Sequence, residues 1–162
     1  FTALQTGVID GQENPRTAGA TPVAAPGDLV PEDEALLDAA GGLRATLREE
    51  MDRPQFHTAL VKTWEVVSEA NRYIDQAAPW KLKKSDPARM ATVLYVLAET
   101  IRRLALLTQP FMPDATGAML DQLAVAPAGR GFDGLDERLQ PGTPLPKPEG
   151  LFPRFVEEEA AS

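Results

Sequence analysis

The helical core of this chain is best defined by residues 86–108, which read DPARMATVLYVLAETIRRLALLT. Apolar side chains recur there every three or four residues, the spacing of one face of an α-helix. Pro87 fits the first turn of such a helix, with Ser85 or Asp86 as its cap, and Pro110 and Pro113 end it. The expected apolar face consists of Met90, Val93, Leu94, Leu97, Ile101, Leu104 and Leu107.

The same periodicity predicts a helix before this one and a short helix after it. The earlier helix begins after Pro31, with three acidic residues in its first turn, where carboxylates favour the helix dipole. Gly41 and Gly42 predict a soft or kinked centre for it. Its apolar face consists of Leu36, Ala40, Leu43, Leu47 and Met51. The short helix follows Pro113 and turns Ala118, Met119, Leu120 and Leu123 inward.

Between them, a helix is predicted from about Pro54 to Ala77. Trp64 lies on its apolar stripe and is expected to pack in the core. Asn71 interrupts the stripe, and a buried asparagine needs partners for its amide, so a cap or an inter-helix hydrogen bond is favoured over contact with a base. The stripe consists of Phe56, Leu60, Trp64, Val67, Asn71 and Ile74.

These patterns predict an all-α fold, an antiparallel bundle of about four helices over residues 32–125. Residues 16–31 are rich in Ala, Gly and Pro without a period and predict a loop. Beyond Val125, prolines and glycines predict an irregular C-terminal tail, residues 126–162. The length is that of one domain with tails.

The composition narrows the function classes. The chain has no cysteine, which excludes disulfides and thiolate metal sites, and no apolar run approaches the ~20 residues that span a bilayer. We therefore expect no membrane partner and a soluble, cytoplasmic protein. The formal net charge is −8, but residues 51–110 carry nine basic and six acidic residues, so this part has a local charge of +3.

No catalytic or metal site is expected. His57 is the only histidine, so neither a nucleophile–histidine pair nor a histidine-rich metal site can be assembled, and we expect a partly exposed helical residue there. Acidic residues 32–34 and 157–159 are interpreted as a solvated helix start and a charged tail.

The tripeptide Ala78-Pro79-Trp80 is followed by Lys81, Lys83 and Lys84. An aromatic ring beside ammonium groups suits an unstacked nucleobase and its phosphates. The alternative is that Trp80 folds back into the core and that the lysines form an ordinary solvated face.

From about Pro22 to its end, the chain resembles the C-terminal anticodon-binding domain of methionyl-tRNA synthetases. The order and spacing of several motifs carry the resemblance. They are Trp64-Glu65-Val66-Val67, Ala70-Asn71-Arg72-Tyr73, Ala78-Pro79-Trp80, Ala91-Thr92-Val93-Leu94-Tyr95, Gln109-Pro110-Phe111-Met112-Pro113 and Leu151-Phe152-Pro153-Arg154.

The resemblance implies that Trp80 stacks in the methionine anticodon, with Asn71 and Arg72 as further candidate anticodon-binding residues. Phosphate contacts of the tRNA are then expected from Lys81, Lys83 and Lys84. In the family, an asparagine and an arginine one turn apart on a preceding helix read the first anticodon base. That pair is absent here, so the bundle is expected to lack its first helix.

The resemblance also implies partners and cofactors. The expected partners are the anticodon of methionine tRNA and a catalytic domain in cis, with no DNA. The family's His-Ile-Gly-His and Lys-Met-Ser-Lys-Ser signatures are absent, so the chain itself is expected to be non-catalytic. ATP and methionine would bind that other domain, and no cofactor is expected in this part. A tail that runs along the missing enzyme body is expected to be loosely held here.

Residues 1–15 resemble a segment of the solute-binding proteins of TRAP-type dicarboxylate transporters. We interpret the chain as a chimeric fragment with a junction near residues 16–20, and residues 1–31 are expected to make few contacts with the bundle. Two functional alternatives remain open: a free-standing helical module that binds protein, and a transport-related solute-binding fragment.

Overall fold

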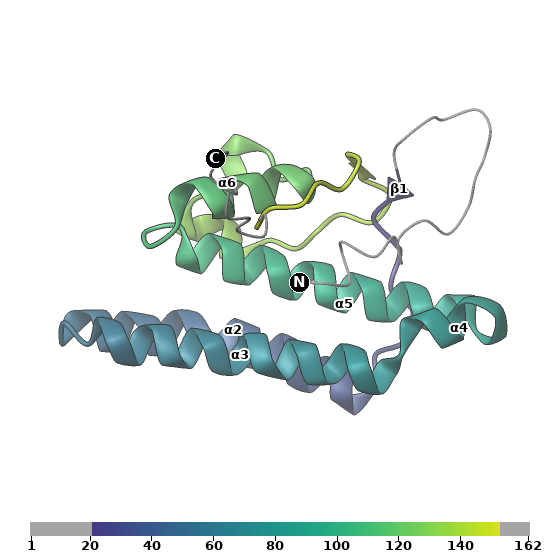
Figure 1. Cartoon of the computed structure of the whole chain (residues 1–162), viewed down its shortest axis with the longest axis horizontal. Helices are drawn as coiled ribbons and strands as arrows, with labels where there is room; N and C mark the ends of the chain where they lie inside the picture. Colours follow the sequence, from purple (N-terminus) through teal and green to yellow (C-terminus); the bar gives the residue numbers. More distant parts are fainter. Residues whose placement is uncertain (1–20, 153–162) are drawn as a thin grey trace, which may run out of the picture.

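The computed structural model describes residues 21–152. The TRAP-like segment, residues 1–15, lies outside the described residues, as do the acidic residues 157–159. Five α-helices account for most of the described part, with two 3-10 turns and one pair of very short strands (Figure 1). The helices are α2 (Pro31–Asp52), α3 (Phe56–Ala77), α4 (Pro79–Ser85), α5 (Pro87–Thr108) and α6 (Pro113–Gln122). The 3-10 turns are η1 (Pro127–Gly129) and η2 (Phe132–Asp136), and the strands are β1 (Thr21–Pro22) and β2 (Pro144–Leu145).

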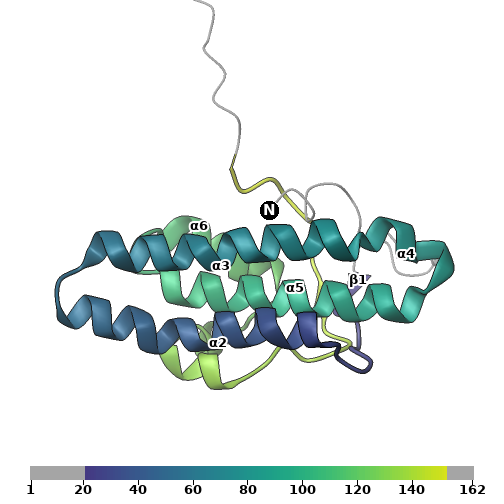
Figure 2. The same ribbon diagram turned by 90° about the horizontal axis from the view of Figure 1, so that it is seen from below.

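The all-α bundle is confirmed. Helices α2 and α3 form an antiparallel pair, and α5 packs along both of them (Figures 1 and 2). Helix α6 and the segment that follows it cover the opposite side of α5 (Figure 1). Short α4 joins α3 to α5 at the end of the bundle remote from the α2–α3 turn (Figure 2). The fold therefore presents α4 at one tip of an elongated body.

Helix α5 is the centre of the core. Asp86 caps it as predicted, because its carboxylate accepts the Arg89 backbone N–H at 2.9 Å. Leu104 and Leu107 pack with α2 and α3, whereas Ala105 and Leu106 pack with α6. The helix is thus buried on more than the single face that its periodicity predicted, since layers cover it from both sides.

The predicted stripe of α3 is confirmed at Val67 and Ile74, which pack against the core, and is wrong in the first half of the helix. Ala59 and Thr63 face the core, while Trp64 is 55% exposed and Phe56 and Leu60 are exposed with it. Small side chains let α3 approach its neighbours closely, so the large side chains on the next face remain outside. Trp64 is not a core residue.

Gly41 and Gly42 produce no break, since α2 is one continuous helix. A Cβ atom on Gly41 would lie 2.8 Å from a guanidinium nitrogen of Arg103 on α5. The missing side chain therefore makes room for Arg103 instead of marking a kink.

The expectation of few contacts for residues 1–31 was wrong for its described part. Strand β1 pairs antiparallel with β2, and Val23 is buried against Tyr95 and Leu145. The Gly27 N–H donates to the Thr92 hydroxyl at 2.8 Å. Residues 21–30 are an integral part of the fold.

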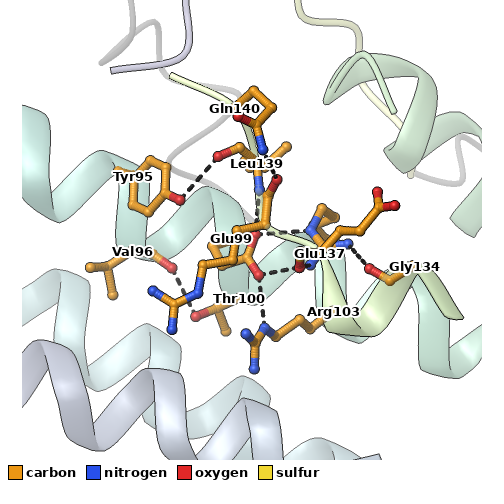
Figure 3. A network of polar contacts seen from close by, with 11 residues as sticks. Tyr95, Val96, Glu99, Thr100, Arg103, Gly134, Glu137, Leu139 and Gln140 are labelled. Carbon is orange, nitrogen blue, oxygen red and sulfur yellow. Dashed lines mark hydrogen bonds and ion pairs between the residues drawn. The ribbon is translucent and has the colours of Figure 1, made fainter. Parts of the chain in front are cut away.

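The tail was expected to be loosely held, and its described part is not. A buried carboxylate on α5, Glu99, accepts hydrogen bonds from Arg102 and Arg103 at 2.8 Å and from the Leu139 N–H at 3.0 Å (Figure 3). Arg102 also donates to the Gly134 carbonyl at 2.7 Å and to the Glu137 carbonyl. This network, together with buried Leu139 and Leu145, fixes the return of the chain along α5.

Candidate nucleic-acid interface

The candidate site is built on the turn from α3 into α4. Ala78 ends α3 in the left-handed region, with φ 43° and ψ 58°, and its N–H bonds to the Ile74 carbonyl at 2.9 Å. Pro79 then starts α4, where a residue without an N–H is well tolerated. Trp80 therefore lies in the first turn of a short helix that sequence periodicity did not predict.

Trp80 points outward. Its side chain is 49% exposed, whereas the neighbouring Pro79 is buried, and Leu82 packs against the apolar cluster of α2, α3 and α5. The alternative in which Trp80 joins the core does not hold. Lys81, Lys83 and Lys84 are exposed on the same seven-residue helix. An aromatic ring and three ammonium groups thus share one small, solvent-facing element.

Asn71 and Arg72 lie near the end of α3, about 9 Å and about 7.5 Å of helix rise before Ala77. Both are exposed, so the expectation of a buried, structurally bonded Asn71 was wrong. Arg72 lines one end of a shallow hollow of about 630 Å³ along α3. His57 lines the same hollow and is exposed in the first turn of α3, as predicted. The other lining residues are Leu60, Val61, Trp64, Glu65, Ser68 and Glu69.

A buried polar cluster lies beneath this end of the bundle. Both oxygens of Asp33 accept two hydrogen bonds each: Oδ1 from the Tyr73 hydroxyl at 2.6 Å and Arg89 Nη2 at 2.7 Å, Oδ2 from Arg89 Nη1 at 2.5 Å and the Val30 N–H at 3.1 Å. Asp33 is fully buried, which corrects its interpretation as part of a solvated helix start. Sequence reasoning missed this cluster, because its members lie 40 and 56 positions apart.

The electrostatics of the cluster follow from burial and pairing. Burial alone would raise the pKa of Asp33, but hydrogen bonds from Arg89, Tyr73 and Val30 and the Arg89 charge outweigh it and hold that pKa below its ordinary value. Burial, and then the bond to the Asp33 carboxylate, raise the pKa of the Tyr73 hydroxyl. The ion pair is therefore charged at neutral pH.

Two negative findings concern residues 21–152 only. No group of three or more histidine, aspartate or glutamate side chains in that range is placed to hold a metal ion. None of its helices combines the length and apolar character needed to cross a bilayer.

The sequence and fold of this chain match one protein family. The family described as the anticodon binding domain of methionyl tRNA ligase matches residues 23–162. The methionine–tRNA ligase of Rhizobium meliloti (strain 1021) is 52% identical over 136 residues, which are 83% of this chain and 26% of that protein. The Mycobacterium tuberculosis (strain H37Rv) ligase is 44% identical over 134 residues, 80% of this chain and 26% of that protein.

Solved structures agree with the sequence relatives. The apo form of Mycobacterium tuberculosis methionyl-tRNA synthetase superposes with a TM-score of 0.86 at 38% identity, covering 97% of this chain and 32% of that one. The same enzyme in complex with methionyl-adenylate gives 0.83 at 39% identity, covering 94% and 29%. The chain thus spans about a quarter of the length of the curated relatives it matches. It belongs to the family of anticodon-binding domains of methionyl-tRNA ligases.

Proposed function

We propose that this chain recognises the anticodon of methionine tRNA as the C-terminal part of a methionine–tRNA ligase. The observation that carries the proposal is the half-exposed Trp80 on α4, with buried Pro79 beside it and lysines around it. A tryptophan whose backbone is anchored offers a ring on which one unstacked base can stack, worth about 1 to 3 kcal/mol.

The lysines of α4 supply the second part of recognition. Lys81, Lys83 and Lys84 contact the phosphates that flank the stacked base, and these contacts hold the register of the RNA without reading its sequence. These lysines attract a nearby phosphate despite the net charge of −8. Salt screens charges more than about 8 Å away at physiological ionic strength, so distant acidic residues have little effect on that phosphate. Binding by this chain alone is therefore weak and falls steeply with salt concentration.

Asn71 and Arg72 extend the interface along α3. Both side chains are exposed near the α4 end of that helix, where they can reach a nucleotide next to the one on Trp80. Arg72 can contact a phosphate or stack on a base, and Asn71 can hydrogen-bond a base edge. We assign base stacking to Trp80 and supporting contacts to these two.

The chemistry of aminoacylation belongs to a catalytic domain in cis, where ATP and methionine bind. We propose no cofactor for the present chain and a cytoplasmic place of action, with RNA and not DNA as the nucleic-acid partner. The two tasks need different structures. Binding of the anticodon requires an aromatic ring and cationic side chains, whereas activation of methionine requires a site that binds ATP and methionine together.

The test is the affinity of the chain for a short RNA hairpin that carries the anticodon CAU. Trp80→Ala should weaken binding by about tenfold or more, the loss of one stacked base. Trp64→Ala is the matched control, because it removes an equally exposed tryptophan on the other side of the α3–α4 turn. Equal losses from both substitutions, or no preference of the wild-type chain for CAU over a scrambled loop, would remove the stacking role.

A protein-interaction module remains a second candidate, favoured by the exposed apolar side chains of α3 at positions 56, 60, 61 and 64. The same pair of substitutions separates the candidates. A module that uses this apolar face loses partner binding in Trp64→Ala and keeps it in Trp80→Ala.

A further inference from the structure

Helix α4 has only seven residues, too few to hold a fixed position by helix propensity alone. Its placement must come from the elements around it. Pro79 and Leu82 bury apolar surface against the bundle, but apolar contacts carry little directional information. The direction in which Trp80 leaves the body therefore needs another determinant.

The Asp33 cluster joins the helices on both sides of α4. Tyr73 is in the last two turns of α3, before α4, and Arg89 is in the first turn of α5, after α4. Both bind the Asp33 carboxylate of α2, at 2.6 Å from the tyrosine and at 2.5 and 2.7 Å from the two guanidinium nitrogens. One buried carboxylate thus joins the last turns of α3 to the first turn of α5, the two segments that α4 connects.

We propose that Asp33, Tyr73 and Arg89 are positioning residues for RNA recognition, which fix the direction of Trp80 by tying α3 and α5 to the start of α2. This inference rests on the proposed function for its biological purpose, but the positioning itself can be measured without RNA.

Stability alone is a weak reason for a buried ion pair. A buried ion pair is often matched or exceeded in stability by apolar side chains of similar volume, because desolvation of the charges is costly. The rest of this core end is apolar, with Leu36, Leu37 and Val93 packed around Tyr73. A bidentate guanidinium–carboxylate pair adds what those side chains cannot, a fixed angle between the elements it joins.

The chain contains a matched control for the tyrosine. Tyr95 is buried like Tyr73, and its hydroxyl also makes one hydrogen bond, donating to the Leu139 carbonyl at 3.0 Å. That bond ties α5 to the return segment, away from α4. Tyr73→Phe and Tyr95→Phe therefore remove the same atom from two buried sites, only one of which flanks Trp80.

The experiment uses the full chain in a Trp64→Phe background, which leaves Trp80 as the only tryptophan. The first measurement is the fluorescence anisotropy decay of Trp80 without RNA. Tyr73→Phe and Arg89→Lys should increase its fast, large-amplitude motion, whereas Tyr95→Phe should leave it unchanged. Thermal melting of each variant gives the loss of stability, so that variants of equal stability are compared.

The second measurement is affinity for the CAU hairpin at low salt. Tyr73→Phe and Arg89→Lys should bind roughly three- to thirtyfold more weakly, and Tyr95→Phe should bind like the background chain. Unchanged Trp80 motion in both α4-flanking variants, or equal changes in Tyr95→Phe, overturns the inference. A background chain that does not bind the hairpin overturns the proposed function instead, and the anisotropy measurement still decides whether the cluster positions Trp80.

Discussion

The two tryptophans have almost the same exposure for different reasons. Trp80 is held outward by the short helix that carries it, whereas Trp64 lies on the exposed face of α3. We expect Trp64→Ala to lower the free energy of unfolding by about 1 kcal/mol or less, since little buried surface is lost. Leu106→Ala, at a fully buried position, should cost about 2 to 5 kcal/mol.

Urea denaturation followed by circular dichroism is the appropriate measurement, because tryptophan fluorescence itself changes in one variant. A Trp64→Ala loss as large as that of Leu106→Ala would show that the tryptophan is packed in solution.

The periodicity of α3 could not have decided between these outcomes. Residues spaced by three and four mark a face, but α3 has two adjacent apolar faces, one with Ala59 and Thr63 and the other with Phe56 and Trp64. Hydrophobicity favours the larger side chains, whereas close helix packing selects the smaller ones. Only the neighbouring helices settle which face is inside.

Two buried carboxylates, Asp33 and Glu99, are expected to make the stability of the fold depend on pH in acid. Burial would raise the pKa of Glu99, but hydrogen bonds from Arg102 and Arg103 and their charges hold it below its ordinary 4.5, and the pKa of Asp33 lies below its ordinary 3.8. The unfolded chain therefore takes up protons at a higher pH than the folded chain. The stabilisation is present above these ordinary values and is lost as the pH falls below them.

The free energy of unfolding should accordingly fall between about pH 5 and about pH 3, with a shallower slope in Asp33→Asn. Urea titrations at a series of pH values measure it. A flat profile across this range in the wild-type chain would mean that neither carboxylate is paired in solution.

At the scale of elements, the Glu99 network decides whether the return segment stays on α5. Glu99→Gln leaves the buried guanidinium of Arg102 and the partly buried one of Arg103 without their counter-charge, and breaking a buried pair in this way costs about 3 to 5 kcal/mol. We expect residues 126–152 to become sensitive to limited proteolysis in this variant, while α2 and α3 stay protected.

The exposed pair between Arg44 and Asp136, at 3.3 Å, offers a control on the same segment. Arg44→Ala should change stability by less than about 1 kcal/mol and leave cleavage unaltered, since an exposed ion pair contributes little. Equal cleavage of both variants would mean that the Glu99 network does not keep the return segment on α5, and that buried Leu139 and Leu145 do so instead.

Elements differ in how far the sequence predicts them. Helices α2 and α5 follow from long apolar periods, and α5 also from its Asp86 cap. Helix α4 escaped prediction because seven residues, three of them lysines, cannot show a helical period. The ordered return segment was not predicted because Glu99 and Arg102 look like surface charges in the sequence and are buried only in the folded chain.

The residues of the candidate site also differ in how far the sequence predicts them. Trp80 and its lysines form one contiguous motif, so the sequence predicts them together. The Asp33 cluster comes from α2, α3 and α5, and its members become neighbours only when the bundle forms. A single sequence contains no signal that pairs them.

At the scale of the whole molecule, half of the large apolar side chains that are exposed within residues 21–152 lie on α3. Phe56, Leu60, Val61 and Trp64 are exposed on this helix, and the last three line a hollow of about 630 Å³. Large contiguous apolar patches mark contact sites or association-prone surfaces. On the opposite layer, the exposed large apolar side chains of the described residues are Phe132 and Phe152, which are far apart in sequence.

We therefore expect the chain to associate as its concentration rises, with a melting temperature that depends on concentration. Sedimentation velocity at a series of concentrations measures the association directly. Leu60→Glu should suppress it, because a carboxylate on the apolar face must be desolvated in any contact, while costing little stability at an exposed position. The matched control is Glu34→Gln on the exposed side of α2, which should leave association unchanged. The expectation is contradicted if the wild-type chain sediments as a monomer at every concentration and its melting temperature does not change. In that case charged residues along the hollow, such as Glu65, Glu69 and Arg72, prevent two copies of this face from associating.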